Sequence, residues 1–205
     1  MDPAAEASWR LEWGDRVYFS RLSARQARVV TLFSPHLQLE VLGITEVVPG
    51  RLLHLRVRVE GQTLHLVNIY ALASGPERAC FFQQVSTFLG SLDPRECLVL
   101  GGDFNLTLEE RDRMGIEPSL AAVDILREIV AHHSLVDIWR GHHTDNDSTF
   151  TFVWVAEQQL SHSRLDRICF SQCIFHRPTL PGSASPILGP PFGGRDSLSF
   201  LLAFQ

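Results

Sequence analysis

The clearest feature of the hydrophobic pattern is a pair of alternating segments near the middle of the chain. Leu52–Val59 and Thr63–Tyr70 both largely alternate apolar and polar residues. Glu60-Gly61-Gln62 joins them in three residues. This pattern predicts a β-hairpin that buries one face and exposes the other.

Three earlier segments also predict strands. Arg16–Ser20 and Arg28–Phe33 are rich in β-branched and aromatic residues, as strands commonly are. Leu37–Val48 predicts a further pair of strands, interrupted near Gly43. Residues 1–15 predict a short amphipathic turn or part of a longer element.

The second half of the chain mixes helical and strand periodicity. Apolar residues recur at helical spacing after Pro76, and again over Leu120–His132. Thr107–Pro118 is a charged loop. The remaining strands are expected at Cys97–Leu100, Thr149–Val155, Arg164–Phe170 and Leu198–Phe204. Strand pairs, a helix, a strand, a helix and further strands predict an α/β fold, a mixed-sheet sandwich flanked by helices, in one domain over residues 1–205.

Composition narrows the class of protein without deciding its function. The chain is 45% hydrophobic and 20% charged, with a formal net charge of -5, which is ordinary for a globular domain. We expect an intracellular monomer, because the sequence shows no secretory signal and no apolar run that could cross a membrane. The negative charge is unusual for a nucleic-acid binder, although a metal held by carboxylates would supply positive charge locally.

The main candidate for chemistry is Gly101-Gly102-Asp103-Phe104-Asn105, directly after an apolar strand. Residues i and i+2 of an extended chain point the same way, so Asp103 and Asn105 would share one site. A carboxylate and a carboxamide suit a hard divalent cation, or a water molecule held against a phosphate. The alternative is a turn in which the aspartate bonds to its own backbone.

Further candidates lie at other strand ends. Tyr70 ends the predicted hairpin, and Asn68 shares its face. Alternation places Arg164 and Asp166 on one side of a strand, where they form either a surface ion-pair ladder or a phosphate-binding and orienting pair. Asp196 is a carboxylate at a loop-to-strand junction.

The order of these motifs resembles the endonuclease/exonuclease/phosphatase superfamily, and in particular the apurinic-type endonuclease domain of LINE-type (non-LTR) retrotransposons. The resemblance runs from about Trp9 to the C-terminus. The matching segments, in order, are Asn68-Ile69-Tyr70, a helix, Leu100–Asn105, Leu135–Arg140, a Thr-Phe pair and Ser163–Ile168.

The resemblance implies a four-layer sandwich and hydrolysis of phosphodiester bonds in DNA with Mg²⁺. Asp103 would be the general base, Asn105 would hold that aspartate and the scissile phosphate near the metal, and Tyr70 would stabilise the phosphate. Asp166 would orient a histidine of a C-terminal Ser-Asp-His motif. Asp103, Asn105 and Asp196 would lie at the metal, while Asn68 and Arg164 would lie near the phosphate.

The chain also departs from the pattern of that family. The family begins with a strand that carries a Trp-Asn pair, followed by a metal-binding Glu. We expect both to be missing here, because the sequence contains neither motif and Met1 aligns just after that Glu. Near its C-terminus this chain has Arg195-Asp196-Ser197 where the family has Ser-Asp-His. After Tyr70 it has Ala71-Leu72-Ala73 where the family has Ala-Pro-Asn. Losing one transition-state donor typically costs about 10²–10³ in rate. We therefore expect a truncated, degenerate endonuclease domain with weak or no activity.

Two other functions remain open from the sequence. A non-catalytic remnant could bind nucleic acid or protein through the surviving surface. Alternatively, a phosphatase of the same superfamily could act on a small phosphorylated substrate.

Overall fold

A six-stranded mixed sheet forms the centre of the protein. The computed structural model describes residues 3–22, 28–114, 120–142, 150–156 and 159–172. The strand order is β3-β4-β5-β6-β10-β7, with β5 and β6 parallel and the other neighbours antiparallel. The strands are β3 (Leu39–Val48), β4 (Leu52–Val59), β5 (Gln62–Tyr70), β6 (Cys97–Asp103), β7 (Leu135–Asp137) and β10 (Asp166–Ser171).

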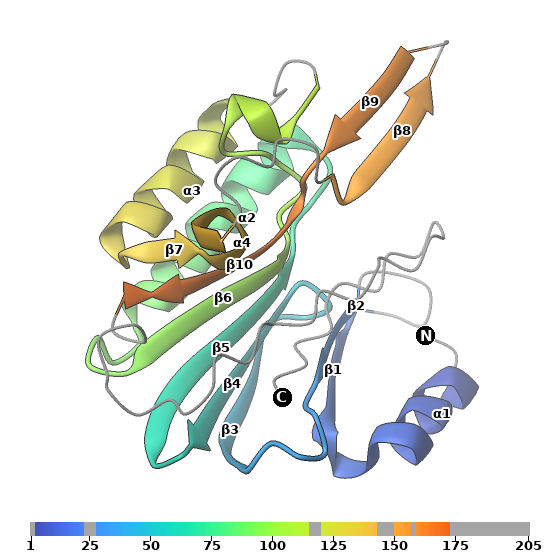
Figure 1. Ribbon diagram of the computed structural model, residues 1–205, viewed down its shortest axis with the longest axis vertical. Coiled ribbons are helices and arrows are strands. Elements are labelled where there is room, and N and C mark those ends of the chain that lie inside the picture. Colours follow the sequence, from blue (N-terminus) through green and yellow to red (C-terminus); the bar gives the residue numbers. More distant parts are fainter. Residues whose placement is uncertain (1–2, 23–27, 115–119, 143–149, 157–158, 173–205) are drawn as a thin grey trace.

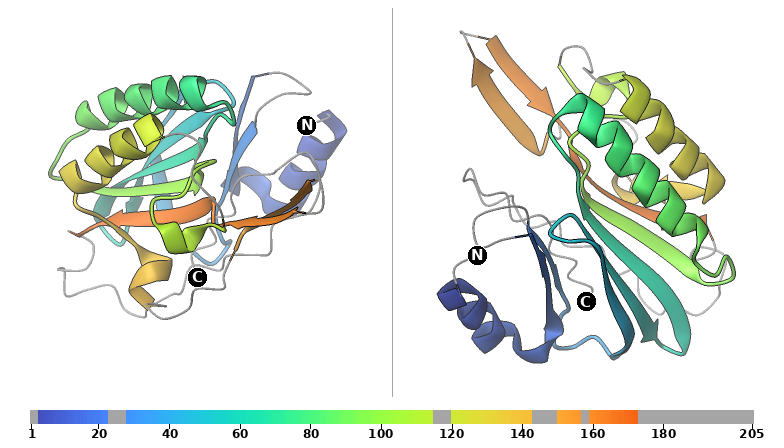
Figure 2. Two further views of the ribbon diagram at one scale, coloured as in Figure 1. Left: turned by 90° about the horizontal axis from the view of Figure 1, so that it is seen from above. Right: turned by 180° about the vertical axis from the view of Figure 1, so that it is seen from behind.

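Helices cover one face of this sheet and a small second sheet covers the other (Figure 1). The helices are α2 (Gly75–Gly90) and α3 (Leu120–His132). The second sheet pairs β1 (Val17–Arg21) with β2 (Arg28–Leu32), and α1 (Pro3–Trp13) lies beyond it, as Figure 2 also shows. The remaining elements are η1 (Gly14–Arg16), η2 (Glu110–Asp112), α4 (Ile138–His142), β8 (Phe152–Ala156) and β9 (Gln159–Ser163).

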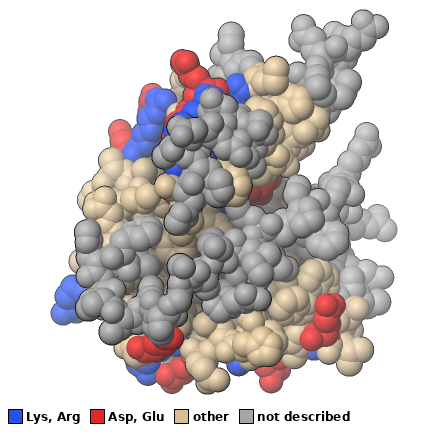
Figure 3. All heavy atoms as spheres, in the orientation of Figure 1, with Lys and Arg blue, Asp and Glu red and all other residues tan. Residues whose placement is uncertain are grey.

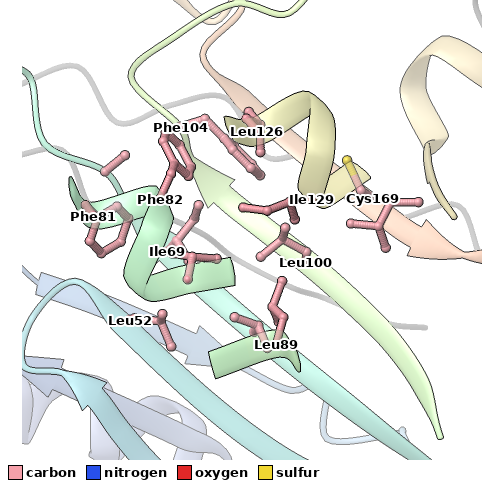
Figure 4. Packing of buried hydrophobic residues seen from close by; sticks show 14 of the residues in the cluster. Leu52, Ile69, Phe81, Phe82, Leu89, Leu100, Phe104, Leu126, Ile129 and Cys169 are labelled. Atoms are coloured by element: carbon pink, nitrogen blue, oxygen red, sulfur yellow. The ribbon is translucent and has the colours of Figure 1, made fainter. Parts of the chain in front are cut away.

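Three hydrophobic clusters separate these four layers. The largest fills the space between α2, α3 and the six-stranded sheet, where Phe82 and Leu126 meet Leu100 (Figure 4). A second cluster joins that sheet to β2 through residues such as Phe33 and Leu55. The third packs β1 and β2 against Trp9 and Trp13 of α1. The predicted α/β sandwich of a mixed sheet flanked by helices is thus confirmed.

Most of the individual elements follow the sequence pattern, and several differ from it. The hairpin β4–β5 is present, and α3 has the predicted bounds. The prediction of two strands over Leu37–Val48 was wrong, because β3 is one strand whose register shifts at Gly43 in a β-bulge. The pattern did not predict β7, α4 or β9, and residues 1–15, for which it allowed a turn or part of a longer element, contain the helix α1. The strand predicted at Leu198–Phe204 lies outside the described residues.

A buried histidine pair crosses the hairpin beneath α2. His54 Nε2 lies 3.0 Å from His65 Nδ1, and the ring of His54 contacts Phe88. Burial, reinforced by the charge of His65, lowers the pKa of His54 to about 4. The folded protein therefore holds this imidazole neutral at pH values where the unfolded chain takes up a proton.

This pair gives a pH-dependent prediction. As pH falls from about 6.5 towards 4, the unfolded chain protonates His54 first, so the free energy of unfolding decreases. Relative to His54→Gln, the wild-type protein is expected to lose about 1–2 kcal/mol over that interval, allowing for partial solvent screening. Urea unfolding of both proteins at pH 7.5 and pH 4.5 measures the difference, and a gap that stays constant contradicts the prediction.

Among the described residues, no helix is long and apolar enough to span a membrane. Cys80, Cys97 and Cys169 are free thiols.

Candidate functional site

Three predicted site residues lie in one row across neighbouring strands. In the parallel pair β5–β6, Tyr70 is in register with Asp103. In the antiparallel pair β6–β10, Asp103 is in register with Asp166. Side chains in register on neighbouring strands share one face of a sheet. The sheet therefore brings together a phenol and two carboxylates that lie 33 and 63 residues apart in the sequence.

This row lies at one end of the space between the two sheets. Alternation along β5 places Tyr70 and Asn68 on the same face as Leu66, which belongs to the cluster that joins the sheets. The same alternation relates Asp103 to Val99 in β6 and Asp166 to Ile168 in β10. The apolar residues fill the interior of the sandwich and the polar ones replace them at its end.

Gly102 allows β5 and β6 to approach closely just before Asp103. Its φ is +133°, and a Cβ atom at this position would lie 1.9 Å from the carbonyl oxygen of Ile69. Beyond it, Ala71 N–H donates to the Asp103 carbonyl (2.8 Å) and Phe104 N–H donates to the Leu165 carbonyl (2.9 Å). These bonds fix the backbone on both sides of Asp103.

Asn105 holds Asp103 through its backbone. Its φ of +49° turns the chain, so that its N–H donates to Asp103 Oδ1 at 2.8 Å. Its side-chain Nδ2 donates to the Ala71 carbonyl at 2.7 Å. The Asx turn that was the alternative interpretation of this motif is present, and it fixes the rotamer of the carboxylate. Asn105 thereby links the end of β5 to Asp103.

Both carboxylates of this row have raised pKa values. Burial raises the pKa of Asp103 to about 7, and the adjacent charge of Asp166 adds to the rise. Burial also raises the pKa of Asp166, while a hydrogen bond with Thr151 and the charge of Arg167 oppose that rise. A pair of partly buried carboxylates with raised pKa values is typical of metal sites and of general acid–base chemistry.

Tyr70 is held in place by Arg51. The Arg51 guanidinium carbon lies 4.4 Å from the centre of the Tyr70 ring, a cation–π contact. Tyr70 N–H donates to the Arg51 carbonyl at 2.8 Å, and Arg51 Nη1 donates to the carbonyls of Tyr70 and Ala71 at 3.3 and 3.4 Å. Arg51 precedes β4 as a single basic residue, and no sequence motif marks it as part of the site.

Arg78 is a second arginine that the sequence did not single out. It lies buried in the first turns of α2, and its Nε donates to the Leu72 carbonyl at 2.9 Å, while Nη2 also bonds to the Ala73 carbonyl. Its charge lowers the pKa of Asp103, against the larger effect of burial. Arg78 therefore both orders the segment after Tyr70 and offsets part of the negative charge of the site.

The structure places the two weaker candidates inside the protein. Asn68 is 1% exposed and its Nδ2 donates to Val30 O (2.9 Å) and Thr31 Oγ1 (3.1 Å), which joins the two sheets. Arg164 is 3% exposed and is paired with Asp112 (3.0 Å) and Asp137 (2.6 Å). The surface ion-pair ladder considered for Arg164 is therefore wrong, because its ion pairs are buried. Asp196 lies outside the described residues.

The donor set fits a hard cation at Asp103 and Asp166. Mg²⁺ in proteins commonly relies on one or two carboxylates and keeps several water ligands. The described residues contain no group of three or more His, Cys, Asp or Glu side chains that could hold a metal ion. Two adjacent carboxylates whose burial disfavours their charge would nevertheless be stabilised by a divalent cation.

No protein-family profile matches the chain. A curated relative, the "Transposon TX1 uncharacterized 149 kDa protein" of Xenopus laevis, is 44% identical over 201 residues. The match covers 98% of this chain and 15% of the relative, so the chain spans a small part of that protein.

Solved structures share the fold. The AP endonuclease LMAP of Leishmania major has a TM-score of 0.59 at 18% identity, with 83% of this chain and 66% of that chain covered. The endonuclease domain of TRAS1, a telomere-specific non-LTR retrotransposon, has a TM-score of 0.57 at 16% identity, with 84% and 78% covered. The resemblance that the motifs indicated is confirmed by these matches and by the transposon relative.

Proposed function

We propose that this chain, which has the endonuclease/exonuclease/phosphatase fold and matches part of a transposon protein, is a Mg²⁺-dependent DNA endonuclease domain of a LINE-type retrotransposon. The observation that carries the proposal is the row of Tyr70, Asp103 and Asp166 on adjacent strands, with Asn105 bonded to Asp103. The transposon relative supports DNA as the substrate. The fold alone would fit other phosphoesterases equally well.

In this proposal Asp103 is the general base. Its position is fixed by Asn105 N–H, and its carboxylate would accept a proton from the attacking water. Mg²⁺ would be held by Asp103, with Asp166 beside it, and by Asn105 and Asp196 as the family resemblance implies, and it would stabilise negative charge on the phosphate oxygens. Asp166 lies next to Asp103, at the position from which the family resemblance implies that it orients a histidine.

Tyr70 stabilises the phosphate in the proposed reaction. Its ring is fixed by Arg51, so its hydroxyl needs little reorganisation to donate to a phosphate oxygen. Arg164 and Asn68, which the sequence also indicated as phosphate ligands, are better assigned to holding the site together, since both side chains are bonded within the protein.

The proposed activity is weak. Ser197 replaces the histidine that Asp166 would orient, and Ala73 replaces an asparagine that would contact phosphate. Such changes remove preorganised donors, and each typically lowers a rate by about 10²–10³. On the face shown in Figure 3, basic and acidic side chains of the described residues are interspersed.

Nicking of supercoiled plasmid in the presence of Mg²⁺ tests the proposal. Slow nicking that Asp103→Ala abolishes supports it, whereas nicking that survives this change assigns the activity to another protein in the preparation. Salt-dependent DNA binding without cleavage favours a non-catalytic remnant instead. Release of inorganic phosphate from nucleotides or phosphoinositides, without nicking, favours a phosphatase.

The role of Tyr70 gives a separate prediction. Tyr70→Phe removes one hydroxyl but keeps the ring that packs against Arg51, so the free energy of unfolding should change by less than about 1 kcal/mol. Loss of one donor to the transition state should lower kcat about 100-fold. Plasmid nicking and urea unfolding measure the two effects. A variant that nicks as fast as the wild-type protein excludes Tyr70 from the reaction.

A further inference from the structure

A cluster of five charged residues, four of them buried and one partly exposed, lies behind the candidate site. It consists of Asp112, Asp137, Arg140, Arg164 and Arg167, and we call it the Asp112 cluster. The side chains of Asp112 and Arg167 are each 1% exposed, and that of Arg164 is 3% exposed. Its members come from η2, β7, α4, β10 and the segment between β9 and β10.

Asp112 is the centre of this cluster. Its carboxylate accepts from Arg164 Nε (3.0 Å) and Nη2 (3.3 Å), and from Arg140 Nη2. A longer contact of 3.5 Å links it to Arg167. Although burial opposes it, the hydrogen bonds from Arg164 and Arg140 hold the pKa of Asp112 below its usual range. The carboxylate is therefore charged and surrounded by three guanidinium groups.

Asp137 ties a second part of the chain to the same arginines. It accepts from Arg164 Nη2 at 2.6 Å and from the backbone N–H of Arg140 at 3.3 Å. Three arginines and two aspartates leave one excess positive charge among these five residues. Buried ion pairs add little net stability compared with apolar residues of similar size, so stability alone does not account for such a cluster.

The cluster is connected through the backbone to the segments that carry both carboxylates of the candidate site. Asp166 lies two residues after Arg164 and directly before Arg167, and Arg164 N–H donates to the Asp112 carbonyl at 2.8 Å. On the other side, Arg167 Nη1 donates to the Leu106 carbonyl at 2.9 Å, in the turn that follows Asp103. The cluster therefore bonds the start of β10 and the turn after β6 to the same group of side chains.

We propose that the Asp112 cluster is a positioning device that fixes the separation of Asp103 and Asp166, with Asp112 and Asp137 as its positioning residues. Its effect on turnover rests on the proposed function, whereas its effect on the geometry of the two strands does not. Small displacements of reacting groups have large effects on rate, and a shift of about 1 Å can cost about 100-fold.

Kinetics of three variants test the proposal. Asp112→Asn and Asp137→Asn keep the shape of each side chain and remove its charge, while Leu89→Ala makes a cavity far along α2 as a control for lost stability. At a temperature where all are folded, we expect kcat to fall about 100-fold in Asp112→Asn and about 10-fold in Asp137→Asn, with KM within about twofold. Leu89→Ala should keep kcat.

The proposal is overturned if folded Asp137→Asn retains the wild-type kcat, or if Leu89→Ala loses as much. Asp137→Asn serves this purpose even where Asp112→Asn does not fold, because Asp137 lies at the edge of the cluster and is 18% exposed. A rise in KM at constant kcat would also overturn it, since it would indicate a role in binding DNA.

Hydrogen exchange gives a measurement that does not depend on nuclease activity. The amides of Asn105 and Asp166 donate to Asp103 Oδ1 and Thr151 Oγ1 at 2.8 and 3.2 Å. In Asp137→Asn their exchange should accelerate at least about 10-fold relative to Leu89→Ala, while amides in β4 exchange alike in both. Equal exchange in the two variants overturns the positioning role, and a wild-type protein that never nicks DNA contradicts only the proposed function.

Discussion

Asp103→Asn is expected to lower plasmid nicking by about 10³-fold or more and, in the absence of metal, to make the folded protein more stable. The loss of activity follows from removing the general base and one carboxylate of the proposed metal site. The gain in stability follows from removing a charge that the folded protein disfavours. A substitution that lowers activity and raises stability is expected where a site keeps an unfavourable charge for function.

The stability effect depends on pH in a defined direction. The folded protein raises the pKa of Asp103 from 3.8 to about 7, because the carboxyl is buried beside Asp166. The stabilisation from protonated Asp103 is thus complete below about pH 4 and lost as pH rises through 7. Asn resembles the protonated form, so at pH 8 the variant should be more stable by about 2 kcal/mol, and the gap should close towards pH 4.

Thermal unfolding with EDTA and with Mg²⁺ measures both parts of this prediction. At pH 8 with EDTA, a gain of about 2 kcal/mol raises the Tm of the variant by about 4–8 °C. Mg²⁺ should raise the Tm of the wild-type protein and have less effect on the variant. Asp124→Asn, an exposed change on α3, is the matched control and should leave Tm and nicking unchanged. A variant that is less stable than the wild-type protein at pH 8 contradicts the assignment of Asp103 as a carboxylate whose charge the folded protein disfavours.

Sequence periodicity predicted the parts of this fold that depend on one element or on near neighbours. Leu120–His132 repeats its apolar residues every three or four positions, and α3 has those bounds. The hairpin of β4 and β5 likewise follows from alternation and a short connection. Tyr70, Asp103 and Asp166 could be singled out because each ends or begins an apolar strand, where polar groups are expected to be functional.

The parts that were missed depend on contacts between distant segments. Asp112 looks like one more charge in a polar loop, and only the fold shows that it is buried among three arginines. Arg164 alternates like a surface residue, although it pairs with carboxylates 27 and 52 residues earlier. A glycine interrupts the alternation of a strand in the same way at a β-bulge and at a break between two strands, so the pattern around Gly43 does not distinguish the two. A local sequence pattern does not show which side chains a residue contacts when those side chains are distant in the sequence.

The site also depends on a glycine whose role is purely steric. Gly102→Ala is expected to lower the free energy of unfolding by about 3 kcal/mol or more, because a Cβ atom would lie 1.9 Å from the Ile69 carbonyl oxygen at a φ of +133°. The strands β5 and β6 would have to separate, and they carry Tyr70 and Asp103. Activity should therefore fall even under conditions in which the variant is folded.

Gly90→Ala is the matched control for this change. Gly90 ends α2, its added Cβ meets no atom within 4 Å, and alanine favours a helix over glycine by roughly 0.5–1 kcal/mol. Urea unfolding should therefore show the same substitution acting in opposite directions at the two sites. If Gly102→Ala were tolerated as well as Gly90→Ala, β5 and β6 could not approach as closely as described, and the alignment of Tyr70 with Asp103 would have to be abandoned.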